Sequence, residues 1–357
     1  MKQPVVVLTG GGTAGHVSVN QALIPVFLGK GYSVHYIGSH EGIEKELIAD
    51  GHPEVVYHAI QSGKLRRYFS LKNFTDPFRV GAGTLQALSI LRKVKPEIIF
   101  SKGGFVSVPV VMAAKLANVP VVVHESDVTP GLANKLALPF SSQIFTVFEQ
   151  TLQYVPAAKS MCTGPIIRPE LFMGNREEGL RRTGLNSKKP VFIIMGGSQG
   201  SAVLNEAVRN ELPALLEKYQ IIHLCGKGNV VEGLAVAGYV QYEYVTDELP
   251  DLLAAADYAV SRAGSNAIFE LLAIHKPMLL VPLAASKSRG DQLLNAEYFA
   301  SKGLALQIEE EQFEVQSVTE QFDALVKEKA RLMSNIEKTT EPKTPEKMAE
   351  LILSFQK

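Results

Sequence analysis

The fold is decided by the stretch Val5-Val6-Val7-Leu8-Thr9-Gly10-Gly11-Gly12-Thr13-Ala14-Gly15-His16, near the N-terminus. Its unbroken apolar run, Val5–Leu8, predicts a strand that is buried on both faces of a sheet. The glycines after this run predict a tight turn, and a helical pattern follows the turn. Strand, glycine turn and helix in this order are typical of a parallel α/β sheet whose turn faces a ligand.

The same alternation continues along the chain and then restarts. Val191–Met195 is a second apolar run, followed by the glycine turn Gly196–Gly200 and a helix from about Ser201. The pattern therefore predicts two similar α/β domains, each with a parallel sheet. Further strands are predicted at Val34–Ile37, Val55–Tyr57, Ile98–Phe100, Val119–Val123, Ile144–Phe148, Ile221–Leu224, Tyr258–Ser261, Met278–Val281 and Ala305–Ile308, and helices near 19–29, 41–50, 81–94, 106–117 and 129–138.

The boundary between the domains is expected within residues 163–189, where prolines and a charged segment are typical of a linker. This gives a first domain of residues 1–163 and a second domain of residues 164–344. In two-domain sheets of this kind the last helix often packs back on the first domain. That is the expectation for about residues 345–357.

Length and composition limit the class of protein. The 357 residues suggest two domains, and 46% apolar with 20% charged residues excludes disorder over most of the chain. Lys plus Arg and Asp plus Glu both number 36, so net charge gives no general reason to bind nucleic acid. Cys162 and Cys225 are too few for a disulfide framework or a cysteine-rich zinc site, which fits a reducing cytoplasm. Neither a signal peptide nor a transmembrane helix is predicted, because the apolar runs are short or interrupted.

The first glycine turn allows several interpretations. It satisfies G-x-G-x-x-G, but a dinucleotide site needs an acidic residue at the end of the second strand, and no carboxylate comes there before Glu41. The Lys-Ser/Thr ending of a P-loop is absent as well. A loop that faces a ligand is favoured over a purely structural turn. His16 is either a base for an attacking hydroxyl or a residue that caps and packs the helix.

The second domain has polar turns of the same kind. Ser198 is either a helix cap or a donor to a phosphate. The backbone of residues 263–266 can donate to a diphosphate. Glu270 either accepts from a ribose diol or is merely an acidic residue that the helix dipole favours near the helix start. Residues 291–295 offer amide and carboxylate groups to sugar hydroxyls. Glycine turns on two facing sheets predict a cleft between the domains.

Residues 64–79 mix basic and aromatic side chains. Five basic residues and one acidic residue are interleaved with Tyr68, Phe69, Leu71, Phe74 and Phe78. This mixture suits an anionic membrane surface, where aromatic rings lie at headgroup level. A solvated loop with a few apolar anchors is the alternative, and the sequence alone slightly favours it.

Taken in order, these motifs are similar to those of one family. The resemblance runs from Val5 to about Gly303 and rests on Gly-Gly-Gly-Thr-Ala-Gly-His at 10–16, Lys-Gly-Gly-Phe-Val-Ser at 102–107, His124-Glu125, Gly-Pro-Ile-Ile-Arg at 164–168, Gly-Gly-Ser-Gln-Gly at 196–200 and residues 261–270. The chain resembles the MurG family of peripheral membrane glycosyltransferases. The resemblance implies a GT-B fold, with two Rossmann-like domains facing each other across a cleft.

The resemblance also implies an activity. It is the inverting transfer of N-acetylglucosamine from UDP-GlcNAc to lipid I, which gives lipid II for peptidoglycan at the cytoplasmic face of the cell membrane. The N-terminal domain would take the lipid-linked acceptor and the C-terminal domain the nucleotide sugar. No metal or cofactor is implied, because helix N-termini and an arginine can meet the charge of the leaving UDP.

Site residues carry over from the family onto matching positions. His16 becomes a candidate base, and Asp127 is a second candidate. The substrate-binding residues that the resemblance implies are Thr13, Ala14, Gly15 and Asp127 near the sugar and acceptor, Arg168 and Ser198 at the diphosphate, Val245 at the uracil through its backbone, Ala263, Gly264 and Ser265 at the phosphates and sugar, Glu270 at the ribose, and Gln292 at the GlcNAc hydroxyls.

The chain also departs from the family. Val19 stands where a proline is usual, Ser126-Asp127 where Gln-Asn is usual, and Asn266 and Asp291 are uncommon. Because these changes touch the acceptor side and spare the UDP side, UDP-GlcNAc is supported more strongly than lipid I. The alternatives are a GT-B enzyme with another acceptor, such as a diacylglycerol or a polyketide aglycone, a UDP-GlcNAc 2-epimerase, and a nucleotide-sugar-binding protein without transferase activity.

Overall fold

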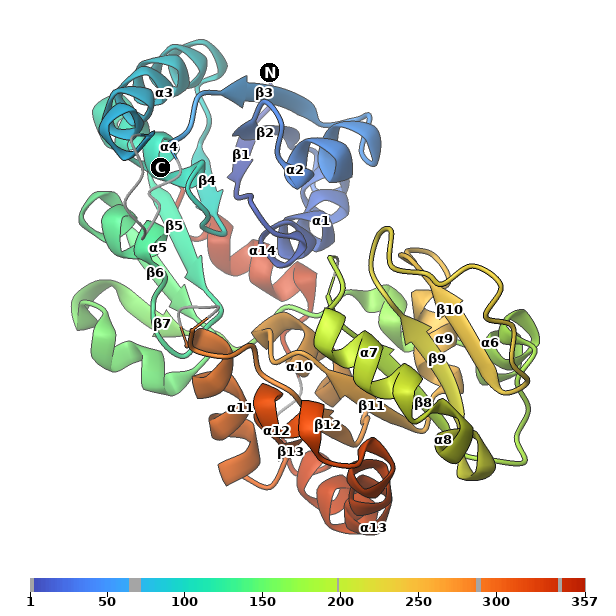
Figure 1. Cartoon of the computed structure of the whole chain (residues 1–357). Helices are drawn as coiled ribbons and strands as arrows, with labels where there is room; N and C mark the ends of the chain where they lie inside the picture. Colours follow the sequence, from blue (N-terminus) through green and yellow to red (C-terminus); the bar gives the residue numbers. More distant parts are fainter. Residues whose placement is uncertain (1–2, 64–71, 198, 287–289, 340–341, 357) are drawn as a thin grey trace. The chain divides into compact units, whose positions relative to one another are not determined.

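The computed structural model describes residues 3–63, 72–197, 199–286, 290–339 and 342–356. The chain folds into two compact units, both mixed α/β (Figure 1). Unit 1 comprises Met1–Arg168 and Pro342–Lys357, and unit 2 comprises Pro169–Glu341. The chain therefore begins in unit 1, passes through unit 2 and returns to unit 1 at its end.

Unit 1 is built on a seven-stranded sheet in which every neighbouring pair of strands is parallel. The strands are β1 (Val5–Thr9), β2 (Ser33–Ser39), β3 (Val56–Ile60), β4 (Ile98–Ser101), β5 (Val121–Glu125), β6 (Gln143–Thr146) and β7 (Ser160–Cys162), in the spatial order β3-β2-β1-β4-β5-β6-β7. Parallel strands end at the same edge of a sheet. The loops after β1, β4 and β5 therefore emerge next to one another.

Helices cover both faces of this sheet. They are α1 (Ala14–Gly29), α2 (Ile43–Lys45), α3 (Lys72–Val94), α4 (Ser107–Ala117), α5 (Leu132–Ala137) and α14 (Pro345–Leu353). Alternate residues of β1 point to opposite faces, so that Leu8 packs in one core with Phe27 of α1 and Met348 of α14, while Val7 packs in another with residues of α3 and α4. Figure 1 shows α14 beside α1, and Lys30 forms an ion pair of 3.0 Å with Glu350. The last helix is thus part of unit 1.

Unit 2 is built on a six-stranded parallel sheet. Its strands are β8 (Val191–Met195), β9 (Gln220–Leu224), β10 (Tyr239–Tyr242), β11 (Tyr258–Ser261), β12 (Met278–Leu280) and β13 (Leu306–Gln307), in the order β10-β9-β8-β11-β12-β13. Its helices are α6 (Arg176–Thr183), α7 (Ala202–Asn210), α8 (Leu212–Lys218), α9 (Leu249–Ala255), α10 (Ser265–Ala273), α11 (Asp291–Ser301), α12 (Glu310–Val315) and α13 (Val318–Ile336).

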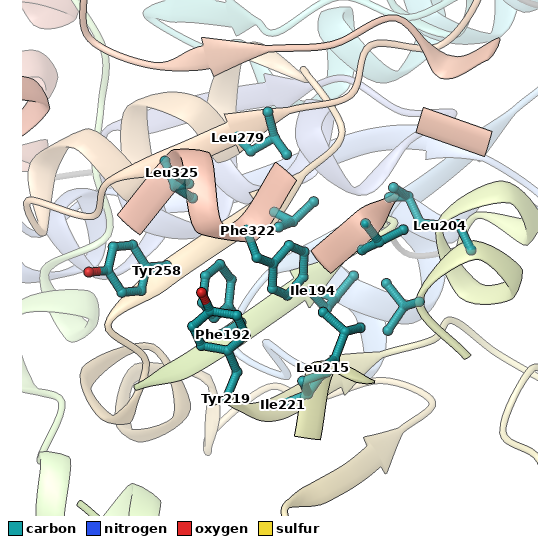
Figure 2. Packing of buried hydrophobic residues seen from close by; sticks show 14 of the residues in the cluster. Phe192, Ile194, Leu204, Leu215, Tyr219, Ile221, Tyr258, Leu279, Phe322 and Leu325 are labelled. Atoms are coloured by element: carbon teal, nitrogen blue, oxygen red, sulfur yellow. The ribbon is translucent and has the colours of Figure 1, made fainter. Parts of the chain in front are cut away.

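An aromatic cluster holds β8 in the core of unit 2. The ring of Phe192 stacks on Phe322 of α13 with centroids 4.0 Å apart, and on Tyr258 of β11 at 4.8 Å (Figure 2). Tyr219 meets the same ring edge-on at 4.9 Å. Offset and edge-on aromatic contacts add to the free energy gained from burial. The cluster therefore fixes the strand that carries the second glycine turn.

Several predicted boundaries were wrong. Helix α1 begins at Ala14 and not near residue 19, because the Thr13 side chain accepts a hydrogen bond from the His16 N–H and caps it. Helix α3 begins at Lys72, nine residues earlier than predicted. In place of one helix over 41–50 there is a single turn, α2, and then a π-helical segment, Glu46–Asp50. The short strands β7 and β10 were not predicted.

Part of the predicted linker is a helix. Residues 176–183 form α6, whose N-terminus is capped by the Asn175 side chain through the Glu178 N–H. Arg176 at its start pairs with Asp257 and donates to the Ala255 carbonyl. The charged residues that suggested a linker are thus a capped helix, with Arg176 tied to the body of unit 2.

Candidate functional site

Three loops meet at the carboxyl edge of the unit 1 sheet. They follow β1, β4 and β5, and hydrogen bonds join them. The Gly11 N–H of the first loop donates to the Gly103 carbonyl of the second at 3.2 Å. Lys102 Nζ of the second loop donates to Ser126 Oγ of the third at 2.5 Å. The first glycine turn and the Asp127 loop therefore belong to one surface, which we call the unit 1 edge.

His16 lies in the first turn of α1 at this edge. Its Nδ1 is 2.9 Å from the Gly11 carbonyl oxygen and 3.1 Å from Thr13 Oγ1. A carbonyl can only accept, so the bond to Gly11 places the proton of the neutral ring on Nδ1 and the lone pair on Nε2. Gly15 precedes His16 in the same helical turn and is half-buried. In this tautomer Nε2 is the ring nitrogen that can accept a proton.

Asp127 is held at the same edge by its neighbour Glu125. The buried Glu125 carboxylate accepts from the Asp127 N–H at 2.9 Å, the Gly131 N–H at 2.9 Å and Asn134 Nδ2 at 2.8 Å. The Asp127 carbonyl accepts from Thr151 Oγ1 at 3.2 Å. The structure therefore brings both candidate bases to one sheet edge, His16 after β1 and Asp127 after β5.

Two ionisable side chains behind this surface are buried. Lys102 is fully buried, and burial lowers its pKa, although the charges of Glu125 and Asp127 oppose that change. Burial, and then the Lys102 charge, hold the pKa of His124 well below its usual value. Neither ring nitrogen of His124 has a hydrogen-bond partner among the described residues, and its ring packs against Phe100. His124 is therefore a neutral core residue, although it belongs to a motif that indicated function.

Unit 2 has a pocket of about 440 Å³ at the carboxyl ends of β8, β11 and β12. Helices α7 and α10 begin at the pocket, and neither has an acidic residue in its first turn. The N–H groups that open a helix, together with the helix dipole, favour an anion there. The pocket is lined by Met195, Gly196, Gly197, Gly200, Ser201, Ala202, Val203, Ser261, Arg262, Gly264, Ala267, Leu283, Gln292 and Glu310.

Two of the predicted binding residues line this pocket. Gly264 is the N-cap of α10, and the turn before it is held by Asn295, whose Nδ2 donates to the Ala263 carbonyl at 3.2 Å. Gln292 Oε1 accepts from the Leu283 N–H at 3.0 Å. This bond orients the side-chain amide, whose Nε2 group can donate to a sugar hydroxyl.

The other predicted binding residues are not among the described residues that line this pocket. Ala263 and Ser265 are buried in the turn that opens α10. Glu270 is half-buried further along that helix, and Val245 is buried after β10; neither is among the described residues that line the pocket. Arg168 is the last residue of the first stretch of unit 1. Ser198 lies outside the described residues, and the side chain of Ala14 is not described.

The pocket also contains an ion pair that the sequence motifs did not predict. The side chains of Arg262 and Glu310 are 11% and 3% exposed, and Arg262 Nη2 donates to Glu310 Oε1. The same nitrogen donates to Ser201 Oγ at 2.6 Å, and Nη1 donates to the Val281 carbonyl at 3.1 Å. One guanidinium thus joins the N-cap of α7, the end of β12 and the start of α12. Arg262 and Glu310 are far apart in the sequence and meet only in the folded chain, so no local motif predicts the pair.

A second missed residue is Glu44. The first carboxylate after β2 is Glu41, but Glu44, three residues later, is the one that reaches the first glycine turn. Its buried carboxylate accepts from the Gly12 N–H at 3.1 Å, the Ser39 N–H at 3.1 Å and Ser39 Oγ at 2.5 Å. The glycine turn of unit 1 therefore binds the carboxylate of Glu44 through the Gly12 N–H. An acidic residue shortly after the second strand was the available signal.

Within the described part of the chain, no helix is long and apolar enough to cross a membrane. Nor do the described residues contain a group of three or more His, Cys, Asp or Glu side chains that could hold a metal ion.

Comparison with known proteins gives the family. Residues 6–146 match the glycosyltransferase family 28 N-terminal domain, and residues 191–351 match its C-terminal domain. The chain is 51% identical over 341 residues, 96% of each protein, to the Staphylococcus aureus (strain bovine RF122 / ET3-1) UDP-N-acetylglucosamine--N-acetylmuramyl-(pentapeptide) pyrophosphoryl-undecaprenol N-acetylglucosamine transferase.

Solved structures give the fold. The crystal structure of Acinetobacter baumannii MurG matches with a TM-score of 0.73 and 22% identity, over 99% of this chain and 100% of that one. Neisseria meningitidis UDP-GlcNAc 2-epimerase, bound to UDP-GlcNAc, matches with a TM-score of 0.65 and 14% identity, over 98% of each chain. Such low identities show a shared fold alone. The two parallel sheets and these neighbours confirm the predicted GT-B fold, and the matches to both of its domains show that the chain belongs to glycosyltransferase family 28.

Proposed function

We propose that this protein transfers N-acetylglucosamine from UDP-GlcNAc to lipid I, undecaprenyl-pyrophosphoryl-MurNAc-pentapeptide, and so makes lipid II for peptidoglycan. The observation that carries the proposal is the 51% identity, across both domains, to a Staphylococcus aureus protein whose name states this transfer. Both predicted site regions are supported by geometry, because each lies at the carboxyl edge of a parallel sheet, where ligands bind in such folds.

The donor belongs in the unit 2 pocket. The N-termini of α7 and α10 point N–H groups at the diphosphate, and Gln292 Nε2 can donate to a GlcNAc hydroxyl. Glu270, further along α10, would accept from the ribose diol, and Val245 would contact the uracil through its backbone. Ser198 and Arg168 would add contacts to the diphosphate. As UDP leaves, these donors stabilise the charge that develops on it.

The acceptor belongs at the unit 1 edge, with His16 as the general base. His16 Nε2 takes the proton from an acceptor sugar hydroxyl as its oxygen attacks the anomeric carbon. The bond from that carbon to the donor phosphate oxygen breaks, UDP leaves with the electron pair, and the configuration inverts. Asp127 would bind or orient the acceptor from the neighbouring loop. Thr13, Ala14 and Gly15 would line the same site.

Association with the membrane surface would be through α3 and the segment before it. Residues 64–71 lie outside the described part of the chain, and the side chains of 72–75 are not described. The described part of α3 exposes Phe78 at 81% and Leu85 at 68%, and Arg79, which follows Phe78 in the chain, is exposed as well. Exposed aromatic and basic groups on one helix favour the headgroup region of an anionic membrane. This supports a peripheral position at the cytoplasmic face, where lipid I would be reached.

The test is UDP release from UDP-GlcNAc by the purified protein, with and without a short-chain lipid I analogue. The proposal predicts release that depends on the analogue. Formation of the 2-epimer of the sugar without any acceptor, with or without release of UDP, would instead assign an epimerase. Tight UDP-GlcNAc binding with neither UDP release nor epimerisation under either condition would assign a binding protein.

A further inference from the structure

The buried carboxylate of Glu44 lies against the glycine turn that presents His16. A Cβ atom on Gly11 would lie 2.4 Å from Glu44 Cδ, and one on Gly42 would lie 2.2 Å from Glu44 Oε1. Two glycines are therefore needed for the side chain to fit. Its hydrogen-bond partners are the Gly12 N–H, the Ser39 N–H and the Ser39 hydroxyl.

One peptide group connects Glu44 to His16. The Gly12 N–H donates to Glu44 Oε2 at 3.1 Å, and the Gly11 carbonyl accepts from His16 Nδ1 at 2.9 Å. These two atoms belong to the same planar Gly11–Gly12 peptide bond, in which N–H and C=O point in opposite directions. A carboxylate on the N–H side draws the peptide dipole toward itself and makes the carbonyl oxygen a stronger acceptor.

The position of this peptide group is fixed. The Gly11 N–H donates to the Gly103 carbonyl at 3.2 Å. A Cβ on Gly104 would lie 2.2 Å from the Gly11 oxygen, so the second loop closes tightly over that atom. The Gly11 carbonyl therefore cannot turn away from His16 without moving both loops.

Three further titratable groups among the described residues contact Glu44's surroundings or the turn: two tyrosines and a lysine. Tyr36 donates to the Gly10 carbonyl and Tyr57 to the Ser39 carbonyl, both at 2.7 Å. Burial, and then the Glu44 charge, raise the pKa of both tyrosines, so both stay protonated near neutral pH. The third is Lys102, whose Cβ approaches Gly10 from the second loop.

We propose that Glu44 is a positioning residue for His16, acting through the Gly11–Gly12 peptide group. It keeps the proton of the neutral ring on Nδ1, so that the lone pair of the base is on Nε2, and it stabilises the ring once Nε2 has taken the acceptor's proton. This is the role that a carboxylate plays when it bonds directly to a catalytic histidine, with one peptide group inserted between the two. The inference rests on the proposed function, in which His16 is the base.

The direct test is NMR of ¹⁵N- and ¹³C-histidine-labelled full-length protein, with His16→Ala used to assign the ring. In the wild type, the ¹⁵N shifts are expected to show the Nδ1–H tautomer. In Glu44→Gln, which keeps the shape but removes the charge, the midpoint of the His16 titration should move about half a pH unit toward acid. Glu46→Gln, an exposed residue on the next turn with the same change of charge, should leave it in place.

Two NMR results would overturn the inference. One is a wild-type ring that carries its proton on Nε2, which needs no variant. The other is a folded Glu44→Gln protein in which His16 titrates as in the wild type. Neither measurement depends on turnover, so a failure of the proposed transfer would be seen separately.

Steady-state kinetics of Glu44→Gln give a second, independent test. Glu44→Gln should lower kcat about ten-fold with the KM for UDP-GlcNAc unchanged, and should move the acidic limb of the pH profile to lower pH. A loop that is merely loosened would lower kcat without moving that limb, and this outcome would also contradict the inference.

Discussion

The buried ion pair Arg262–Glu310 allows a quantitative prediction of how one substitution changes the free energy of unfolding. Its side chains are 11% and 3% exposed, so solvent screens the interaction little. Glu310→Gln keeps the size of the side chain but leaves the Arg262 guanidinium buried without its counter-charge. Breaking a buried pair in this way costs about 3–5 kcal/mol of the free energy of unfolding. For a domain of this size that corresponds to a fall in Tm of about 6–20 °C.

The assay is thermal unfolding followed by circular dichroism, since the chain contains no tryptophan. Arg262→Met with Glu310→Leu removes both charges together, and we expect it to recover most of the lost stability because neither charge is then buried alone. Exposed Glu311→Gln is the control for the change of charge. A fall of less than 2 °C for Glu310→Gln, or a double variant as unstable as the single one, would refute the reasoning.

Three further predictions concern the two substrates and the membrane. His16→Ala should lower turnover at least ten-fold with little change in UDP-GlcNAc affinity by calorimetry, and unchanged turnover would remove His16 from the mechanism. Glu270→Ala should weaken UDP binding about ten-fold through loss of the ribose contact, which an unaltered UDP affinity would contradict. Phe78→Ser should reduce cosedimentation with anionic phospholipid vesicles several-fold, whereas Val315→Ser, equally exposed on unit 2, should not. Equal binding by both variants would place the membrane contact elsewhere.

The sequence was informative where the determinants are local. Buried parallel strands are continuous apolar runs, which is why β8 and β11 were predicted at their observed bounds. Strand β7 was missed because its residues are polar or partly exposed and carry no such run. Helix α6 was taken for a linker because its charges show no apolar stripe; its cap, Asn175, was the local signal that it begins there.

The site residues also separate into those with local determinants and those whose contacts depend on the fold. The glycine turns and His16 follow strands directly and were found from spacing. Glu44 and Glu310 were missed because their roles depend on groups brought close only by the fold, the Gly12 N–H in one unit and Arg262 in the other. A buried carboxylate whose hydrogen-bond partners are distant in the sequence has no local sequence motif that predicts it.

The central claim is tested most directly by incubating the purified protein with UDP-[¹⁴C]GlcNAc and a short-chain lipid I analogue, and by identifying the labelled product. The account predicts a labelled disaccharide lipid with the β configuration at the new linkage, formed together with an equal amount of UDP. Absence of this product, while calorimetry still shows UDP-GlcNAc bound, would contradict lipid I as the acceptor and point to the departures at Val19 and Asp127 as determinants of a different one.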